Sequence, residues 1–187
     1  MKQLTQQLKS GKMEILDVPF PTINKNQVLV QNHYSVISSG TEGKNVSDAR
    51  KGYLAKARSR KKEVKMVIDM IRSEGLRNTY GLVMNKLEAP SPLGYSCSGE
   101  VIAVGSSIND LKIGDKVACG GEGAYHADIV SIYRNLCVKI PDQIDLRQAA
   151  FCTIASIAIQ GIRQADLRFG ENCTVIGLGL LGLITIQ

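Results

Sequence analysis

The stretch that decides the fold is residues 173–187, which read Cys-Thr-Val-Ile-Gly-Leu-Gly-Leu-Leu-Gly-Leu-Ile-Thr-Ile-Gln. A short apolar run over residues 174–176 leads into the pattern Gly-x-Gly-x-x-Gly at Gly177, Gly179 and Gly182, and a second apolar run follows. This order predicts a strand, a glycine turn and the start of a helix.

The glycine spacing is typical of a site that holds a pyrophosphate. The first glycine permits a tight turn, the second lets the phosphates approach the backbone, and the third lets the helix pack close to the strand. Free N–H groups at the start of the helix would face the phosphates. The alternative, an ordinary glycine-rich turn, is less favoured because apolar runs flank the glycines on both sides.

Only the first strand–helix unit of a nucleotide-binding domain is expected here. The acidic residue that would bind the ribose lies about 20 residues beyond the glycines in such domains, and that position falls after Gln187. We therefore expect the chain to be the front part of a longer enzyme or a truncated gene product, inactive by itself as a catalyst.

The composition is that of a globular protein, with 44% hydrophobic and 21% charged residues. No apolar run approaches the 18 or so residues of a membrane span, and the N-terminus lacks a signal-peptide core, so we expect a cytoplasmic protein. The five cysteines include no Cys-x-x-Cys pair, which argues against a disulfide framework and a structural zinc cluster. Cys152 and Cys173 lie in apolar segments and are predicted to be buried thiols.

Positive charge is concentrated in residues 50–65, where eight Lys and Arg side chains face one acid, Glu63, in a chain of net charge +6. A solvated helix face, or a surface that contacts another part of the protein, explains this stretch best. Nucleic-acid binding is disfavoured because only one aromatic residue, Tyr53, lies among the basic side chains.

The rest of the chain alternates between strand and helix patterns. Short strands with turns between them are expected over residues 3–36, and again from residue 99 to residue 140. Between them, residues 47–89 carry a helical period with a stop at Gly75. Asp145 and Gln148 resemble a capping box, and residues 149–162 are apolar nearly all round, as in a helix buried between two domains.

Several motifs together resemble the medium-chain dehydrogenase/reductase superfamily. They are Gly94-x4-Gly99-x-Val101-x3-Gly105, Gly114-Asp115-Lys116-Val117, Gly121-x-Gly123-Ala124-Tyr125 and the terminal glycine pattern. The resemblance implies a mainly β fold: a GroES-like barrel in residues 1–144 with a helical insertion at 47–89. A truncated start of an α/β Rossmann domain would follow in residues 145–187. It also implies an oxidoreductase that uses NAD or NADP, bound by Gly177, Gly179, Gly182, Leu180 and Leu181.

The resemblance departs from the zinc-containing members of that family at two ligand positions. Where they have Gly-His-Glu, this sequence has Gly94-Tyr95-Ser96, and Ser39 stands where they have a cysteine. Tyrosine and serine are poor zinc ligands, so we expect a zinc-independent member with no metal site. The insertion, with Leu54-Ala55-Lys56-Ala57-Arg58, resembles a branch in which this dehydrogenase is fused to a Gfo/Idh/MocA-type oxidoreductase.

Hydride transfer without zinc still needs groups that polarise the substrate oxygen. By the resemblance, Tyr95, Ser39, Thr41 and Glu42 take positions that face the nicotinamide. The alternative is that Tyr95 packs on the barrel and Glu42 is a loop residue. His33 and His126 are weaker candidates.

We expect a small alcohol, carbonyl or sugar derivative as substrate, with no nucleic-acid or membrane partner. The alternative function is a non-catalytic β-barrel interaction module, whose open apolar face would favour a homo-oligomer.

Overall fold

A computed structural model describes residues 1–40, 42–43 and 61–187 of the 187-residue chain. The described residues form two compact units. The first comprises Met1–Gln3, Asp17–Ser38 and Gly94–Gln187, and the second comprises Leu4–Leu16 and Ser39–Leu93. The expected domain boundary at residues 144 and 145 stays a prediction.

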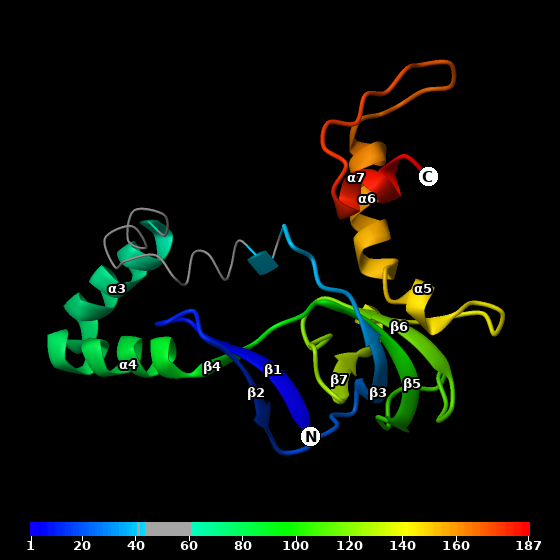
Figure 1. Cartoon of the computed structure of the whole chain (residues 1–187). Helices are drawn as coiled ribbons and strands as arrows, with labels where there is room; N and C mark the ends of the chain where they lie inside the picture. Colours follow the sequence, from blue (N-terminus) through cyan, green and yellow to red (C-terminus); the bar gives the residue numbers. More distant parts are fainter. Residues whose placement is uncertain (41, 44–60) are drawn as a thin grey trace. The chain divides into compact units, whose positions relative to one another are not determined.

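The first unit is built on a curled, fully antiparallel five-stranded sheet with the order β7-β3-β5-β6-β8 (Figure 1). Its strands are β3 (Gln27–Ser35), β5 (Ser96–Val104), β6 (Lys116–Gly120), β7 (Ile129–Tyr133) and β8 (Cys137–Lys139), with a 3₁₀ turn at Arg134–Leu136. Alternate residues of a strand point to opposite faces, so each strand contributes every second side chain to the core.

The main core lies on one face of this sheet. Its fully buried members include Val28 and Val30 from β3, Val101 from β5, Val117 from β6 and Ile132 from β7. Burial of each such side chain is worth about 1.5–3 kcal/mol. The β-rich reading of residues 3–36 and 99–140 is confirmed at the level of its strands.

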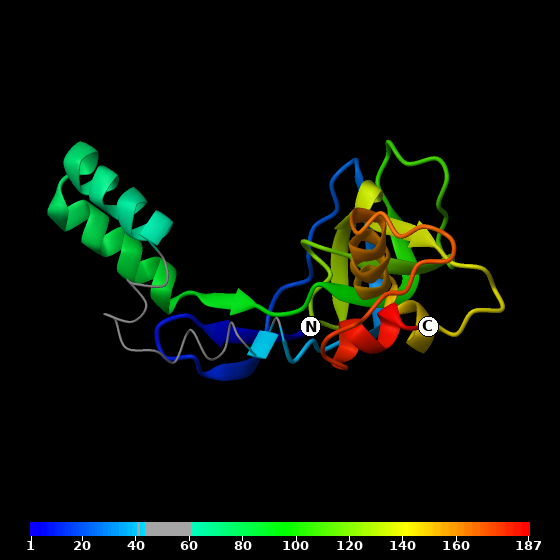
Figure 2. The ribbon, with the colours of Figure 1, turned by 90° about the horizontal axis from the view of Figure 1, so that it is seen from above.

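Helices α5 (Leu146–Ala149) and α6 (Cys152–Gln164) follow the sheet, and the short helix α7 (Leu180–Thr185) packs beside α6 (Figure 2). Asp145 caps α5 as predicted, because its carboxylate accepts a hydrogen bond from the Arg147 N–H at 2.8 Å. The prediction that residues 149–162 are buried all round was wrong. Only Ile154 and Ala158 of α6 are buried, whereas Ile157 and Ile159 are exposed, because a single face of the helix packs on the sheet and α7.

Residues 171–178 form neither helix nor strand, so the expected strand at 174–176 is not formed. A strand of a Rossmann sheet is defined by hydrogen bonds to neighbouring strands, and no strand in the part of the chain that the structure describes pairs with these residues. The glycine turn and the helix start after it are present, and the overall fold class is confirmed.

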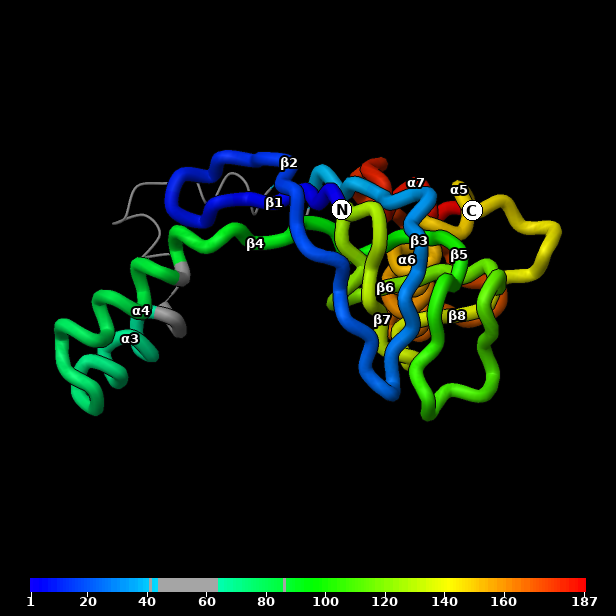
Figure 3. The backbone as a smooth tube through the Cα atoms, turned by 90° about the horizontal axis from the view of Figure 1, so that it is seen from below, coloured from blue at the N-terminus to red at the C-terminus, as the bar shows by residue number. Residues whose placement is uncertain are grey.

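The second unit holds most of a three-stranded sheet and a pair of helices. The sheet order is β2-β1-β4, with β1 (Lys2–Gln7), β2 (Met13–Asp17) and β4 (Pro90–Pro92). Helices α3 (Lys61–Glu74) and α4 (Leu76–Glu88) lie side by side (Figure 3). Gly75 ends α3 with φ +83°, as predicted.

The helical insertion is thus confirmed for residues 61–88. Its earlier part, and most of the basic stretch at 50–65, lie outside the described residues.

All five cysteines have free thiols. Cys97, Cys119 and Cys137 are buried, but Cys152 and Cys173 are exposed, so the prediction of buried thiols at these last two positions was wrong. Cys152 begins the half-exposed helix α6, and Cys173 lies in the segment that pairs with no strand. Among the described residues, no helix has both the length and the apolar character needed to cross a membrane.

Candidate functional site

Two serine hydroxyls of the sheet form hydrogen bonds with residues 146 and 150, at the two ends of helix α5. Ser96 and Ser98 are fully buried in β5, on the face opposite the main core. The Ser96 hydroxyl donates to the carbonyl oxygen of Ala150 at 2.6 Å, and the Ser98 hydroxyl donates to that of Leu146 at 2.5 Å. Sequence reasoning missed both residues. The Ser-x-Ser alternation after Gly94-Tyr95 was the available signal, because it places two hydroxyls on one face of a strand.

Tyr95 lies immediately before this strand, and its position is set by tight backbone packing. Gly94 has φ +104°, and a Cβ atom on it would lie 2.6 Å from the backbone nitrogen of His126, so only glycine fits here. The Tyr95 carbonyl accepts a hydrogen bond from the Gly121 N–H at 2.8 Å. These constraints fix the direction in which the Tyr95 side chain leaves the sheet.

The Tyr95 ring is partly buried against a small apolar cluster. The cluster is formed by Val36, Ala150 and Ile154, with Leu180 and Ile184 of α7 packed on it. Tyr95 and the helix that follows the glycine turn therefore pack on the same cluster. This agrees with the alternative that the ring packs on the barrel, and it also places the residue beside the predicted nucleotide-binding segment.

The three glycines of the turn differ in their surroundings. Gly177 has φ +94°, a conformation that favours glycine. A Cβ on Gly182 would lie 1.9 Å from the Gly177 carbonyl oxygen, so the helix can approach the turn only because residue 182 has no side chain. Gly179, which caps α7, has nothing within 4 Å of its Cβ position. In the pattern Gly-x-Gly-x-x-Gly, the first glycine makes a turn, the second leaves space for the phosphates and the third allows a close contact of the helix. Gly177, Gly179 and Gly182 have these three properties in this order.

A cavity of about 690 Å³ lies between α5–α6 and α7. Its lining is mostly apolar, with Phe151, Leu180, Leu183 and Ile184, and Arg147 supplies a cation. None of the three glycines lines it, so this cavity and the open side of Gly179 are separate features of the surface.

The other predicted site residues belong to the second unit. Ser39 is exposed, and Glu42 is buried, with 7% of its surface accessible. Thr41 lies outside the described residues. Tyr95 is part of the first unit, and the roles of Ser39, Thr41 and Glu42 stay predictions. Of the weaker candidates, His33 is exposed, while His126 contacts the Ser35 hydroxyl through Nδ1 at 2.8 Å.

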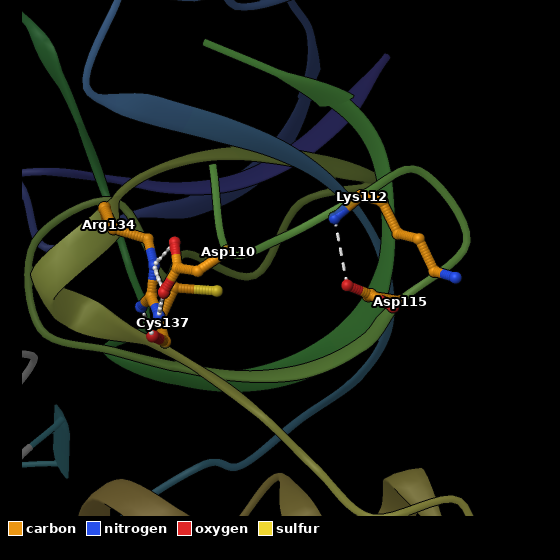
Figure 4. Close-up of polar contacts among 5 residues, drawn as sticks. All are labelled: Asp110, Lys112, Asp115, Arg134 and Cys137. Carbon is orange, nitrogen blue, oxygen red and sulfur yellow. Dashed lines mark hydrogen bonds and ion pairs between the residues drawn. The ribbon is translucent and has the colours of Figure 1, made fainter. Parts of the chain in front are cut away.

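Two carboxylates, Asp110 and Asp115, accept hydrogen bonds near the edge of the sheet; Figure 4 shows Asp110 with Arg134, and Asp115 with the Lys112 N–H. Asp115 is buried and accepts hydrogen bonds from the Lys139 ammonium at 2.7 Å and from the Lys112 N–H at 2.9 Å, which together hold its pKa below the usual value. The exposed Asp110 forms a bidentate pair with Arg134, and the hydrogen bonds of this pair lower the pKa of Asp110 and raise that of Arg134. Because both pairs join loops to strand ends, their role is structural.

No group of three or more His, Cys, Asp or Glu side chains gathers closely enough to hold a metal ion within residues 1–40, 42–43 and 61–187.

Comparison with known proteins gives this arrangement a family context. Residues 64–142 match the alcohol dehydrogenase GroES-like domain. The chain is similar to (R,R)-butanediol dehydrogenase of Bacillus subtilis, with 29% identity over 123 residues, or 53% of this chain and 36% of that protein. It is 28% identical to D-xylulose reductase of Saccharomyces cerevisiae over 57% of this chain and 38% of that protein. The matches thus span less than two-fifths of either relative.

The fold is also similar to that of solved dehydrogenases. The structure of galactitol-1-phosphate dehydrogenase from Escherichia coli superposes with a TM-score of 0.71 at 18% identity, covering all of this chain and 51% of that one. The chain thus carries a match to the alcohol dehydrogenase GroES-like domain, is similar in sequence to alcohol and polyol dehydrogenases, and shares the fold of a solved dehydrogenase.

Proposed function

We propose that this chain supplies the N-terminal part of an NAD- or NADP-dependent oxidoreductase that acts on an alcohol, carbonyl or sugar group. The observation that carries the proposal is the glycine turn, in which Gly177 makes the turn, Gly179 is open and Gly182 contacts the turn backbone. The names of the similar proteins, a butanediol dehydrogenase and a xylulose reductase, favour a small hydroxyl-bearing substrate.

The residues of the turn suit a dinucleotide. The backbone of Gly177, Gly179 and Gly182, with Leu180 and Leu181 in the first turn of α7, would hold the pyrophosphate, because a side chain at Gly179 would occupy the open approach. When bound, the nicotinamide supplies the hydride chemistry, and the protein supplies position and electrostatics.

The substrate oxygen would be polarised by hydroxyl groups. In this proposal Tyr95 and Thr41 donate hydrogen bonds to that oxygen, Ser39 lines the pocket, and Glu42 is a further catalytic candidate. The position of Tyr95 supports its part, because its ring packs on the cluster of Val36, Ala150 and Ile154, against which Leu180 after the glycine turn also packs. A donor at this point can serve a substrate held next to the nicotinamide.

Zinc independence is part of the proposal and rests on the donor chemistry. Zinc in proteins is bound by Cys, His and carboxylate groups, whereas tyrosine and serine occupy two ligand positions of the zinc-containing relatives. Fusion to a Gfo/Idh/MocA-type oxidoreductase, and a cytoplasmic location, complete the proposal.

The test is a fluorescence titration of the protein with NADH and with NADPH, repeated on Gly179→Val. This substitution places a branched side chain in the open approach, and we expect dinucleotide affinity to fall by more than about tenfold. Gly161→Val is the matched control, because Gly161 also has nothing within 4 Å of its Cβ position but lies in α6, away from the turn. No affinity for either dinucleotide, or equal affinity in the Gly179 variant, would refute cofactor binding by this turn.

A non-catalytic interaction module is the second candidate. The observation that favours it is the apolar surface of residues 152–187, where Ile157 and Ile159 of α6, Leu183 of α7 and, in the segment between these helices, Ile176 are exposed. Such a module would self-associate without binding dinucleotide. Sedimentation analysis alongside the titration separates the candidates, because a concentration-dependent oligomer without NADH or NADPH affinity supports only the module.

A further inference from the structure

Three buried cysteines lie next to one another on neighbouring strands of the first unit. Cys97 in β5 is paired in register with Cys119 in β6, and Cys119 is paired with Cys137 in β8. Their exposed fractions are 0%, 2% and 5%. The sulfur atoms of Cys119 and Cys137 are 3.9 Å apart, and all three thiols are free. The proposed dehydrogenase function uses none of them.

The strand register distinguishes the two possible pairings. In antiparallel strands, hydrogen-bonded and non-hydrogen-bonded pairs alternate, with Cα separations of about 5.5 and 4.5 Å, and side chains are closer in the second kind. The Ile140 N–H donates to the Lys116 carbonyl, so residues 116 and 140 form a hydrogen-bonded pair. The kind of pair alternates along β6 and β8, and Cys119–Cys137, three positions away, is therefore a non-hydrogen-bonded pair.

The neighbouring pair is of the other kind. The Gly121 N–H donates to the Tyr95 carbonyl, so two positions further along, Cys97–Cys119 is a hydrogen-bonded pair with the wider separation. A disulfide needs Cβ atoms about 3.5–4.5 Å apart. The backbone therefore favours a bond between Cys119 and Cys137 over one between Cys97 and Cys119.

The backbone around the same two residues borders a cavity on the α6 side of the sheet. Cys119 and Cys137 both line a cavity of about 370 Å³, together with the exposed Cys152 and with Thr153 and Ser156 of α6. A cavity of this size admits a reagent little larger than water. The two thiols belong to the core on the other face of the sheet, and β8, which carries Cys137, is an edge strand.

The surroundings also make the two thiols unequal. Cys137 accepts a hydrogen bond from the Cys119 thiol, and the Arg134 guanidinium, which donates to the Cys137 carbonyl (Figure 4), adds a positive charge; both lower the pKa of Cys137. The same contact and burial raise the pKa of Cys119. Since the thiolate is the nucleophile, Cys137 is the residue that reacts first.

We propose that Cys119 and Cys137 form a peroxide-sensitive dithiol, which hydrogen peroxide converts into a disulfide between β6 and β8. The Cys137 thiolate attacks one peroxide oxygen, the O–O bond breaks, and hydroxide leaves as Cys137 becomes a sulfenic acid. The Cys119 sulfur then attacks the Cys137 sulfur, and its proton leaves with the sulfenic oxygen as water. Two thiols are thereby oxidised by two electrons, and one peroxide is reduced.

The disulfide would join the edge strand β8 covalently to β6. Strand β6 ends at Gly120, and the next residue, Gly121, donates its N–H to the Tyr95 carbonyl. Cross-linking the short segment between Cys119 and Cys137 restricts the unfolded chain, so the oxidised protein is expected to melt at a higher temperature than the reduced one.

The experiment treats the folded protein with hydrogen peroxide, removes the oxidant, alkylates the remaining thiols under denaturing conditions and maps the peptides by mass spectrometry. We expect a Cys119–Cys137 cross-link, a mass lower by two hydrogen atoms, and alkylated Cys97. Cys152→Ser is the matched control, because it removes the exposed thiol of the same cavity, and the same cross-link should form in it.

A second variant tests the order of reaction. In Cys119→Ala, Cys137 has no partner, so we expect its sulfenic acid to be trapped by a 1,3-dione reagent. The proposal is overturned if Cys119 and Cys137 both stay reduced in the wild-type protein, or if the cross-link joins Cys97 or Cys152 instead. Because the wild-type peptide map decides this, the test holds even where the alanine variant does not fold.

Discussion

A Cβ atom on Gly182 would stand 1.9 Å from the carbonyl oxygen of Gly177, so the first turn of α7 touches the backbone of the turn before it. This contact ties the position of the helix to the conformation of the glycine turn. Any side chain at residue 182 must push α7 away from the turn, and with it Leu180 and Ile184, which pack next to Tyr95.

Gly182→Ala is therefore expected to loosen α7 while leaving the sheet folded. The core of β3, β5, β6 and β7 contains no residue of α7, so the far-ultraviolet signal of the sheet should be kept. Hydrogen exchange at residues 180–186 should become faster by about tenfold or more, since local opening costs less once the packing is lost. Gly161→Ala is the control, because a Cβ atom at this position in α6 meets open space. Alanine is more favourable than glycine inside a helix, so the free energy of unfolding should rise by about 0.5–1 kcal/mol. Unchanged exchange in the Gly182 variant would contradict the contact.

Ser96→Ala should weaken the attachment of the helical segment to the sheet. The variant removes a fully buried hydroxyl that donates to Ala150 and leaves that carbonyl without its partner, at a cost of about 1–3 kcal/mol. Ser156→Ala is the matched control, because Ser156 is exposed and bonds only within its own helix, to Cys152. Urea unfolding measures both, and equal midpoints for the two variants would show that the Ser96 bond contributes nothing.

Acid should destabilise the protein partly through Asp115. Its pKa is lowered in the folded state by Lys139 and by the Lys112 N–H, so the folded protein binds this proton less readily than the unfolded chain. The resulting stability is fully present above the unfolded pKa of about 3.9 and is lost as the pH falls through the lower folded pKa. In Asp115→Asn, the fall of the free energy of unfolding between about pH 5 and pH 2 should be shallower. Asp142→Asn is the control: Asp142 is exposed, so this variant should show the same change of the free energy of unfolding with pH as the wild-type protein. The same pH dependence in Asp115→Asn as in the wild-type protein would show that the ion pair of Asp115 has no influence.

The purified protein should not contain a stoichiometric amount of zinc. By the resemblance drawn from the sequence, Tyr95 and Ser39 take two positions that hold zinc ligands in zinc-containing members of that family, and neither is a ligand that zinc prefers. Elemental analysis by mass spectrometry should find far less than one zinc per chain, and chelator treatment should leave the melting temperature unchanged. About one zinc per chain, lost on chelation with a fall in melting temperature, would instead show that other residues complete a site.

The sequence alone determined the features that depend on near neighbours. Alternating apolar residues placed the strands β1, β2, β3, β5 and β6, and the helical period within residues 47–89, with the stop at Gly75, placed α3. The spacing of Gly177, Gly179 and Gly182 also gave three distinct backbone roles, because turn conformation and helix start are set within a few residues.

Only the tertiary structure decided what depends on distant partners. Residues 174–176 have strand-forming side chains but form no strand, since a strand exists only with a hydrogen-bonded neighbour. Cys152 and Cys173 look apolar in sequence yet are exposed, because burial depends on what packs against a segment. The same physics brings Cys119 within 3.9 Å of Cys137: each lies in an unremarkable stretch of chain, and strand register alone makes them a pair.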